Sequence, residues 1–232
     1  MNNEYLTLIY ERKINTSTIS DVLDSFGVES ALNPGIRPMI RSGNEKGHYF
    51  AGTAYTVRWA PVRKGADIMA AQESTWEQVK RFLVPELGDG ARKVYVAGAG
   101  PILTSAALAG AMSCTYFDRL GFEGAVLGGA VRDIPELRGL RMPVLASNPI
   151  PVDTQGSYRV AGTGDFCVID NKTIHTGDLI VSDESGTVAV PATLIEAVLD
   201  RACKTDELEA EMLRQIRAGR SLPKLVEEQR RI

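Results

Sequence analysis

Histidine and cysteine are scarce in this chain, and each scarcity excludes a class of chemistry. Only two histidines, His48 and His175, occur in 232 residues, which leaves little room for catalysis based on histidine. The three cysteines, Cys114, Cys167 and Cys203, are too few and too scattered for a disulfide framework or a zinc site. No serine stands in the Gly-x-Ser-x-Gly setting of many hydrolases.

Long apolar runs and an excess of basic charge are also missing. No apolar segment approaches the ~20 residues that a membrane-spanning helix needs. The N-terminus lacks the basic start and apolar core of a signal peptide. The net charge of −3 gives no support for nucleic-acid binding, which usually requires a basic face. We therefore expect a cytoplasmic protein with neither a membrane nor a nucleic-acid partner.

The bulk composition is that of an ordinary globular protein. Hydrophobic residues make up 44% of the chain and charged residues 24%. A length of 232 residues suits one large domain or two small ones. Because no internal repeat, low-complexity tract or linker is visible, we expect a single domain over residues 1–232.

Helix and strand signals are mixed early in the chain, and hairpin signals dominate late. Apolar periodicity predicts helices over 3–13, 18–26, 67–84 and 191–218, a helical turn over 135–140 and a tail helix over 222–231. Short apolar or alternating runs predict strands over 36–40, 50–59, 92–98, 125–127 and 143–146. Two hairpins are expected, 166–169 with 173–175 and 179–182 with 187–190. This order predicts a layered α/β domain.

The stretch from Gly110 to Asp133 has the outline of a functional site. A glycine opens a short helix, Gly121 stands at its expected C-terminal cap, and the apolar run at 125–127 predicts a buried strand that leads to Arg132. The free N–H groups of a helix start can bind an anion. An arginine can hold a carboxylate through two hydrogen bonds, and an aspartate can bind a hard cation. The stretch contains no lysine for Schiff-base chemistry.

This stretch resembles the family of the regulator of ribonuclease E activity A. The sequence Gly-Ala-Val-Arg-Asp at 129–133, about twenty residues beyond a glycine-led helix start, carries the resemblance. Residues 18–24 look like the family's N-terminal helix, and 177–183 with 186–191 look like its C-terminal hairpin. The family includes the class II 4-hydroxy-4-methyl-2-oxoglutarate and 4-carboxy-4-hydroxy-2-oxoadipate aldolases. The resemblance implies a β/β/α swivelling-type sandwich that assembles into homotrimers or homohexamers, with active sites at subunit clefts.

The resemblance also implies a lyase that depends on a divalent metal and acts on 2-oxo acids through a pyruvate enolate. Such an enzyme is an aldolase, an oxaloacetate decarboxylase or both. Asp133 would hold Mg²⁺ or Mn²⁺, directly or through water, and Arg132 would contact the carboxylate or keto oxygen of the substrate. The substrate carboxylate would be held by backbone N–H groups at the helix start, those of Gly110, Ala111, Met112 and Ser113.

Ala111 departs from the pattern of the aldolases, in which this position is usually acidic and handles a proton through a water molecule. Asp118 shares a helix face with Ala111, but roughly 10 Å along the axis is too far for it to substitute. A neighbouring subunit's C-terminal helix offers other candidates: Glu207, Glu209 and Glu211. Oxaloacetate decarboxylation depends less on a general base. The protein could therefore catalyse that reaction, or it could act on a different 2-oxo acid.

A non-catalytic binding protein of the same fold, such as a ribonuclease regulator, is the alternative hypothesis. Asp133 favours the enzyme, because a member that has lost metal chemistry has no need for a carboxylate beside Arg132.

Overall fold

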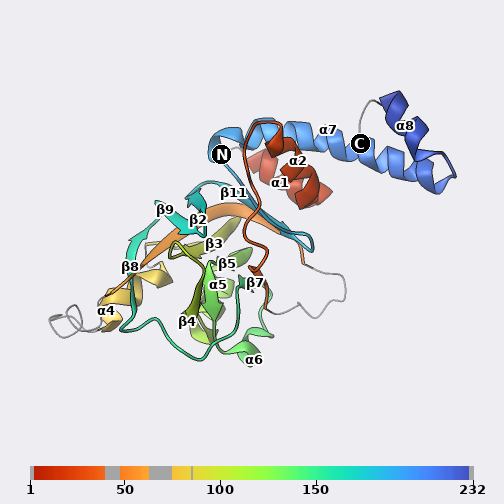
Figure 1. Cartoon of the computed structure of the whole chain (residues 1–232). Coiled ribbons are helices and arrows are strands. Elements are labelled where there is room, and N and C mark those ends of the chain that lie inside the picture. The colour runs from red at the N-terminus through yellow and green to blue at the C-terminus, as the bar shows by residue number, and fades with distance from the viewer. Residues whose placement is uncertain (1–2, 40–47, 63–74, 85, 230–232) are drawn as a thin grey trace.

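The computed structural model describes residues 3–39, 48–62, 75–84 and 86–229 (Figure 1). A curved sheet forms the middle of the molecule, with one group of helices above it and the shorter helices below it in this view. The upper group unites the two ends of the chain: α1 (Asn3–Arg12), α2 (Thr16–Asp24) and α7 (Ile195–Arg217) lie side by side there.

The main sheet has eight strands in the order β1-β7-β5-β3-β2-β11-β12, with β8 also paired to β2. The four strands β2, β3, β5 and β7 run parallel, and the outer strands are antiparallel to their neighbours. The bounds of these strands are β1 Arg37–Pro38, β2 Phe50–Pro61, β3 Lys93–Gly98, β5 Gly124–Leu127, β7 Val144–Ala146, β8 Tyr158–Thr163, β11 Leu179–Asp183 and β12 Gly186–Val190.

Strand β2 lies at the centre of this sheet and contributes to every part of the core. It pairs with β3, β11 and β8, and its buried side chains belong to three apolar clusters, which contain Ala51, Ala54 and Val57 respectively. The alternation of residues 50–59 had suggested a half-buried strand. The strand is confirmed, but the expected half-burial was wrong, because both faces of β2 are covered.

Two small sheets accompany the main one. Strands β4, Leu103–Ala109, and β6, Gly129–Val131, are parallel. Strands β9, Phe166–Ile169, and β10, Lys172–His175, form the expected hairpin. Its turn lies at 170–171, and Asp170 adopts the left-handed backbone conformation there.

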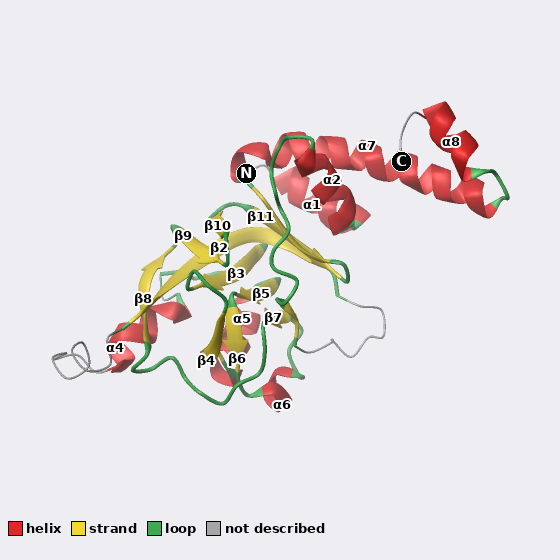
Figure 2. Cartoon of the chain, in the orientation of Figure 1, coloured by secondary structure: helices red, strands yellow, loops and turns green. Residues whose placement is uncertain are grey.

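The terminal helices form a layer of their own against β2, β11 and β12 (Figure 2). They comprise α1 Asn3–Arg12, α2 Thr16–Asp24 and α7 Ile195–Arg217. Helix α8, Leu222–Gln229, follows α7 and lies beyond the sheet (Figure 1). The side chain of Asn15 caps α2 by accepting a hydrogen bond from the Thr18 N–H at 2.8 Å, so this helix begins two residues earlier than predicted. A short 3₁₀ turn, Ala192–Leu194, precedes α7, and Gly219 follows it with a φ of +90°.

Four shorter helical segments lie on the other side of the main sheet. They are α4 Thr75–Val79, a 3₁₀ turn at Lys80–Leu83, α5 Ala111–Leu120 and α6 Ile134–Leu137. Much of the helix expected over 67–84 lies outside the described residues. Helix α5 ends at Gly121 with a φ of +86°, as the glycine predicted.

The predicted α/β class, with helices at both ends of the chain, is confirmed. Among the described helices, none has both the length and the apolar character needed to cross a membrane. All three cysteines are buried and unpaired.

Candidate functional site

The pairing of β4 with β6 brings the two halves of the predicted site together. Ala109 at the end of β4 is paired with Val131 at the end of β6, and the strands are parallel. Their next residues, Gly110 and Arg132, therefore leave the small sheet at the same edge. The Arg132 N–H also donates to the Ala109 carbonyl oxygen at 3.1 Å.

Gly110 is required by close packing at this edge. Its φ of −150° is open to any residue, but a β-carbon at this position would lie 2.6 Å from Asp133 Oδ2 and 2.8 Å from Arg132 Cγ. The buried Ser113 hydroxyl holds the turn by accepting from the Gly110 N–H and donating to the Gly110 carbonyl, each at 3.0 Å. The absence of a side chain at 110 lets Arg132 and Asp133 approach the start of α5.

Asp133 points back toward α5 because its backbone is left-handed, with φ 63° and ψ 44°. This conformation is uncommon for a residue other than glycine and costs of order 1–3 kcal/mol, so the surrounding structure must maintain it. Its Oδ2 accepts a hydrogen bond from the Ala111 N–H at 3.0 Å, and Arg132 Nε lies 3.6 Å away. Within the described residues Oδ1 makes no hydrogen bond.

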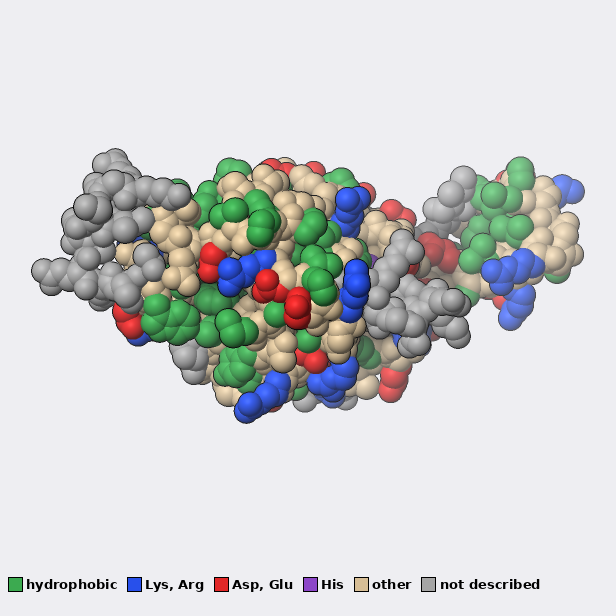
Figure 3. All heavy atoms as spheres, turned by 90° about the horizontal axis from the view of Figure 1, so that it is seen from below, with side chains coloured by type: hydrophobic (Ala, Val, Ile, Leu, Met, Phe, Trp, Pro, Cys, Tyr) green, Lys and Arg blue, Asp and Glu red, His purple; other side chains and the backbone are tan. Residues whose placement is uncertain are grey.

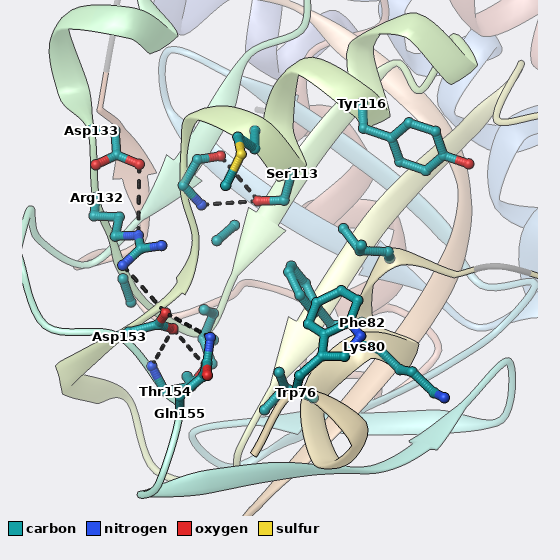
Figure 4. A pocket seen from close by; sticks show the side chains of 17 residues that line it. Trp76, Lys80, Phe82, Ser113, Tyr116, Arg132, Asp133, Asp153, Thr154 and Gln155 are labelled. Atoms are coloured by element: carbon teal, nitrogen blue, oxygen red, sulfur yellow. Dashed lines mark hydrogen bonds and ion pairs between the residues drawn. The ribbon is translucent and has the colours of Figure 1, made fainter. Parts of the chain in front are cut away.

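Arg132 lies between two carboxylates, one of which the sequence analysis missed (Figure 4). Its Nη1 is 3.3 Å from Oδ2 of Asp153, a residue of the loop between β7 and β8. The Thr154 N–H, at 2.6 Å, and the Thr154 hydroxyl fix the other carboxylate oxygen. The loop itself is held against β4, since the Ala107 N–H donates to the Val152 carbonyl at 2.8 Å.

These side chains open into a cavity of about 610 Å³. Gly110, Met112, Ser113, Arg132 and Asp133 line it, whereas Ala111 does not. The other lining residues are Trp76, Val79, Lys80, Phe82, Leu83, Ala107, Leu108, Ala109, Tyr116, Asp153, Thr154 and Gln155. Figure 3 views the molecule from below, where hydrophobic side chains lie close to charged ones on this face.

The expected amide cradle is narrower than predicted. Of its four N–H groups, that of Gly110 is bonded to Ser113 Oγ and that of Ala111 to Asp133. The N–H groups of Met112 and Ser113 remain in the first turn of α5, where a helix offers no carbonyl partner. An anion at this helix start would therefore meet two backbone donors rather than four.

The other acidic candidates have partners within the chain. Asp118 accepts from the Met142 N–H at 3.0 Å and so ties α5 to the start of β7. Three glutamates of α7 bond to Arg12, Thr18 and Arg214; they are Glu207, Glu209 and Glu211 respectively. Helix α7 lies across the main sheet from the cavity (Figure 1), so within one chain these carboxylates do not reach it.

Neither histidine lines this cavity. His48 Nε2 lies 2.9 Å from Ser182 Oγ, and burial lowers the pKa of this imidazole although Glu184 opposes the shift. His175 is exposed at the end of β10. Cys114 lies directly behind the site, and burial raises the pKa of its thiol to about 12, which keeps it uncharged. These groups do not supply the chemistry of the cavity.

The donor set of the site suits a hard cation. The described residues contain no cluster of three His, Cys, Asp or Glu side chains that would form a closed metal cage. Asp133 and Asp153 instead offer carboxylate oxygens on either side of Arg132, beside open space. Mg²⁺ accepts one or two carboxylates and completes its sphere with water and substrate oxygens. The residues present therefore fit Mg²⁺ or Mn²⁺ and do not fit Zn²⁺, which prefers His and Cys ligands.

Fold and site together define an α/β protein in which the start of a helix lies beside an Arg-Asp pair and an open cavity. Comparison with known families identifies the class more closely: the model of the RraA-like family (Aldolase/RraA) matches residues 16–189. The chain belongs to this family.

Two relatives and one solved structure illustrate the range of the family. A "Putative 4-hydroxy-4-methyl-2-oxoglutarate aldolase" of Albidiferax ferrireducens is 34% identical over 63% of this chain and 79% of its own length. Protein DlpA of Legionella pneumophila is 26% identical over 90% of this chain, which spans only 31% of DlpA. RraAS2 of Streptomyces coelicolor, described as an unusual member of the RNase ES inhibitor RraA family, shares the fold with a TM-score of 0.74. It is 22% identical over 92% of this chain and 98% of its own.

Proposed function

We propose that this protein is a divalent-metal-dependent lyase that cleaves 2-oxo acids through a pyruvate enolate. The observation that carries the proposal is the approach of Arg132 and Asp133 to the start of α5, which only glycine at 110 permits. A cation ligand, a guanidinium and free helix N–H groups then face one open cavity. The aldolase name carried by a relative at 34% identity supports the same reaction class.

The chain's own residues account for binding and orientation of the substrate. The N–H groups of Met112 and Ser113 bind the substrate carboxylate, and Arg132 donates to the keto oxygen, on which negative charge develops. A cation held by Asp133 would supply Lewis-acid stabilisation of that charge. In aldol cleavage the C3–C4 bond breaks, the 4-hydroxyl loses its proton, and C3 of the resulting pyruvate enolate then gains one.

Asp153 is the proposed base for the 4-hydroxyl proton. It is the carboxylate that lines the cavity beside Asp133 and Arg132, and Ala111 offers none. Decarboxylation of oxaloacetate breaks the corresponding C3–C4 bond by loss of CO₂ and needs no such base. The proposed site thus supports decarboxylation without Asp153 and aldol cleavage with it.

We further propose a homotrimer or homohexamer that works in the cytoplasm with Mg²⁺ or Mn²⁺. The family membership supports the assembly, and three buried unpaired thiols suit a reducing compartment.

Pyruvate release from 4-hydroxy-4-methyl-2-oxoglutarate and from oxaloacetate, with Mg²⁺ and with EDTA, tests the proposal. We expect turnover only with metal, and we expect Asp133→Ala to lower it at least 100-fold while the far-UV circular dichroism stays unchanged. Equal rates with Mg²⁺ and EDTA for both substrates would refute the lyase. The non-catalytic binding role of this fold would then become the working hypothesis.

A further inference from the structure

The cavity has two chemically different ends (Figure 4). At one end lie Arg132, Asp133, Asp153, Thr154 and Gln155, and the labelled side chains at the other end come from α4, the following 3₁₀ turn and α5. The second end is aromatic, with the labelled rings of Trp76, Phe82 and Tyr116 (Figure 4), and the apolar Val79 and Leu83 also line the cavity. A pyruvate moiety placed at the polar end leaves this second end empty.

The size of the cavity indicates a larger ligand than pyruvate. Cavities of ~300–1,000 Å³ hold ligands of drug size, and they combine apolar walls with a few polar groups. The volume of about 610 Å³ and the single polar end match that description.

Within a single chain, the aromatic wall is supported from behind and exposed in front. The Phe82 ring lies 5.7 Å from that of the buried Trp59, and the Tyr95 hydroxyl donates to the Phe82 carbonyl at 3.0 Å. Trp76 is 47% exposed and Met112 is 84% exposed, although both line the cavity. Apolar surface that is held in place and left in contact with water gains free energy when an apolar ligand covers it.

A second carboxylate would find poor compensation at the apolar end. Among the described lining residues the cations are Arg132 and Lys80. Arg132 already lies between two carboxylates, and the Lys80 amine is paired with Glu77. An ionised carboxylate that leaves water without a partner loses its solvation free energy.

From this arrangement we propose that the substrate carries an apolar, aryl-sized group where 4-hydroxy-4-methyl-2-oxoglutarate carries its second carboxylate. The inference rests on the proposed lyase function and names its substrate class, a 4-aryl-4-hydroxy-2-oxo acid. Cleavage of 4-hydroxy-2-oxo-4-phenylbutanoate breaks the C3–C4 bond. The hydroxyl proton is removed, C4 leaves as the carbonyl of benzaldehyde, and the electron pair remains on the pyruvate enolate, which gains a proton at C3.

Binding of a matched pair of ligands tests the substrate class without turnover. 2-Oxo-4-phenylbutanoate and 2-oxoglutarate differ only in a phenyl group against a carboxylate, and neither has the 4-hydroxyl that aldol cleavage needs. Calorimetric titration of the whole protein with Mg²⁺ present should give a Kd at least tenfold lower for the phenyl compound. Equal affinities, or tighter binding of 2-oxoglutarate, would overturn the inference.

Variants locate the binding of the phenyl group. Trp76→Ala removes half-exposed surface and should reduce the phenyl preference about fivefold to tenfold. Phe82→Ala should reduce the phenyl preference to a similar extent. Trp76→Ala should disturb folding less, because Trp76 is half-exposed whereas Phe82 packs on the buried Trp59. The control is Phe26→Ala, a 40% exposed aromatic that follows α2 and does not line the cavity, and it should keep the preference. A preference that survives both cavity variants would contradict the assignment.

Oxaloacetate decarboxylation separates failure of this inference from failure of the lyase. Metal-dependent turnover of oxaloacetate without a phenyl preference refutes the aryl subsite alone. A phenyl preference without metal-dependent turnover of any of these acids refutes the lyase but leaves the ligand class standing. If Trp76→Ala instead lowers the mass of the assembly and no phenyl preference exists, another copy covers this wall and the subsite is refuted.

Discussion

Arg132 has two anionic neighbours, and this determines what the site can bind. With Asp133 and Asp153 both ionised, the three side chains carry a net charge of −1, which repels an anionic 2-oxo acid. A divalent cation changes the sum to +1. Under the proposed function, the charges of these three residues would therefore make binding of the 2-oxo acid depend on the metal.

Asp153→Asn should separate the two proposed reactions. If this carboxylate takes the 4-hydroxyl proton, kcat for aldol cleavage should fall about 100-fold or more, since general-base catalysis contributes ~10²–10⁴-fold. Oxaloacetate decarboxylation should change by less than about fivefold, because no hydroxyl proton is removed. Steady-state assays of pyruvate release with both substrates measure the difference.

Asp165→Asn is the matched control, because Asp165 lies between β8 and β9 and does not line the cavity. It should leave both rates unchanged. Equal losses in both reactions on Asp153→Asn would show that this residue only positions Arg132.

At the scale of elements, strong local periodicity was enough to predict α2, α7 and the two late hairpins. It was not enough for β4, β6 and β8. Alanine occupies three of the seven positions of β4, and β6 is only the three residues Gly-Ala-Val, so neither strand has a strong local strand signal. Their pairing also joins residues more than twenty positions apart. Local patterns carry no information on such a partner.

The same limitation shaped the prediction of the site. Gly110, Arg132 and Asp133 could be named because a glycine and an Arg-Asp pair stand out beside apolar runs, and their roles followed from the family resemblance at the same positions. Asp153 could not, since a single carboxylate in a proline-rich loop has no local signal. It reaches Arg132 only because β4 holds that loop in place.

Gly110→Ala tests the junction of β4 and α5. The new β-carbon would lie 2.6 Å from Asp133 Oδ2, so the carboxylate must leave the Ala111 N–H. The backbone itself tolerates alanine, because φ is −150°. We expect the Mg²⁺ concentration for half-maximal activity to rise 10–100-fold, as for loss of other groups that orient metal ligands, with little change in Tm.

Gly88→Ala is the control for this substitution, because a β-carbon at Gly88 would meet no atom of the described residues within 4 Å. The Mg²⁺ concentration for half-maximal activity should rise in Gly110→Ala and stay at the wild-type value in Gly88→Ala. Unchanged metal dependence in Gly110→Ala would show that Asp133 does not need its position at the start of α5.

The whole molecule has an unusual outline, because α7 continues beyond the sheet and carries α8 at its far end (Figures 1 and 2). Helices α1 and α2 lie against α7, with contacts such as Thr18 to Glu209. Farther along, Leu213 is 51% exposed and Leu222 is 45% exposed. A helical arm with exposed leucines is suited to pack against another copy of the chain.

Leu213→Glu tests whether this arm takes part in assembly. The wild-type protein should have a mass three or six times the 25.1 kDa of the chain by light scattering after gel filtration. A buried glutamate at an interface is costly, so Leu213→Glu should shift the mass toward the monomer at micromolar concentration. Leu213→Met keeps an apolar side chain of similar size and should retain the assembly. If the glutamate variant keeps the full mass, the arm lies outside the interface, and if the wild type is a monomer, the proposed trimer or hexamer is refuted.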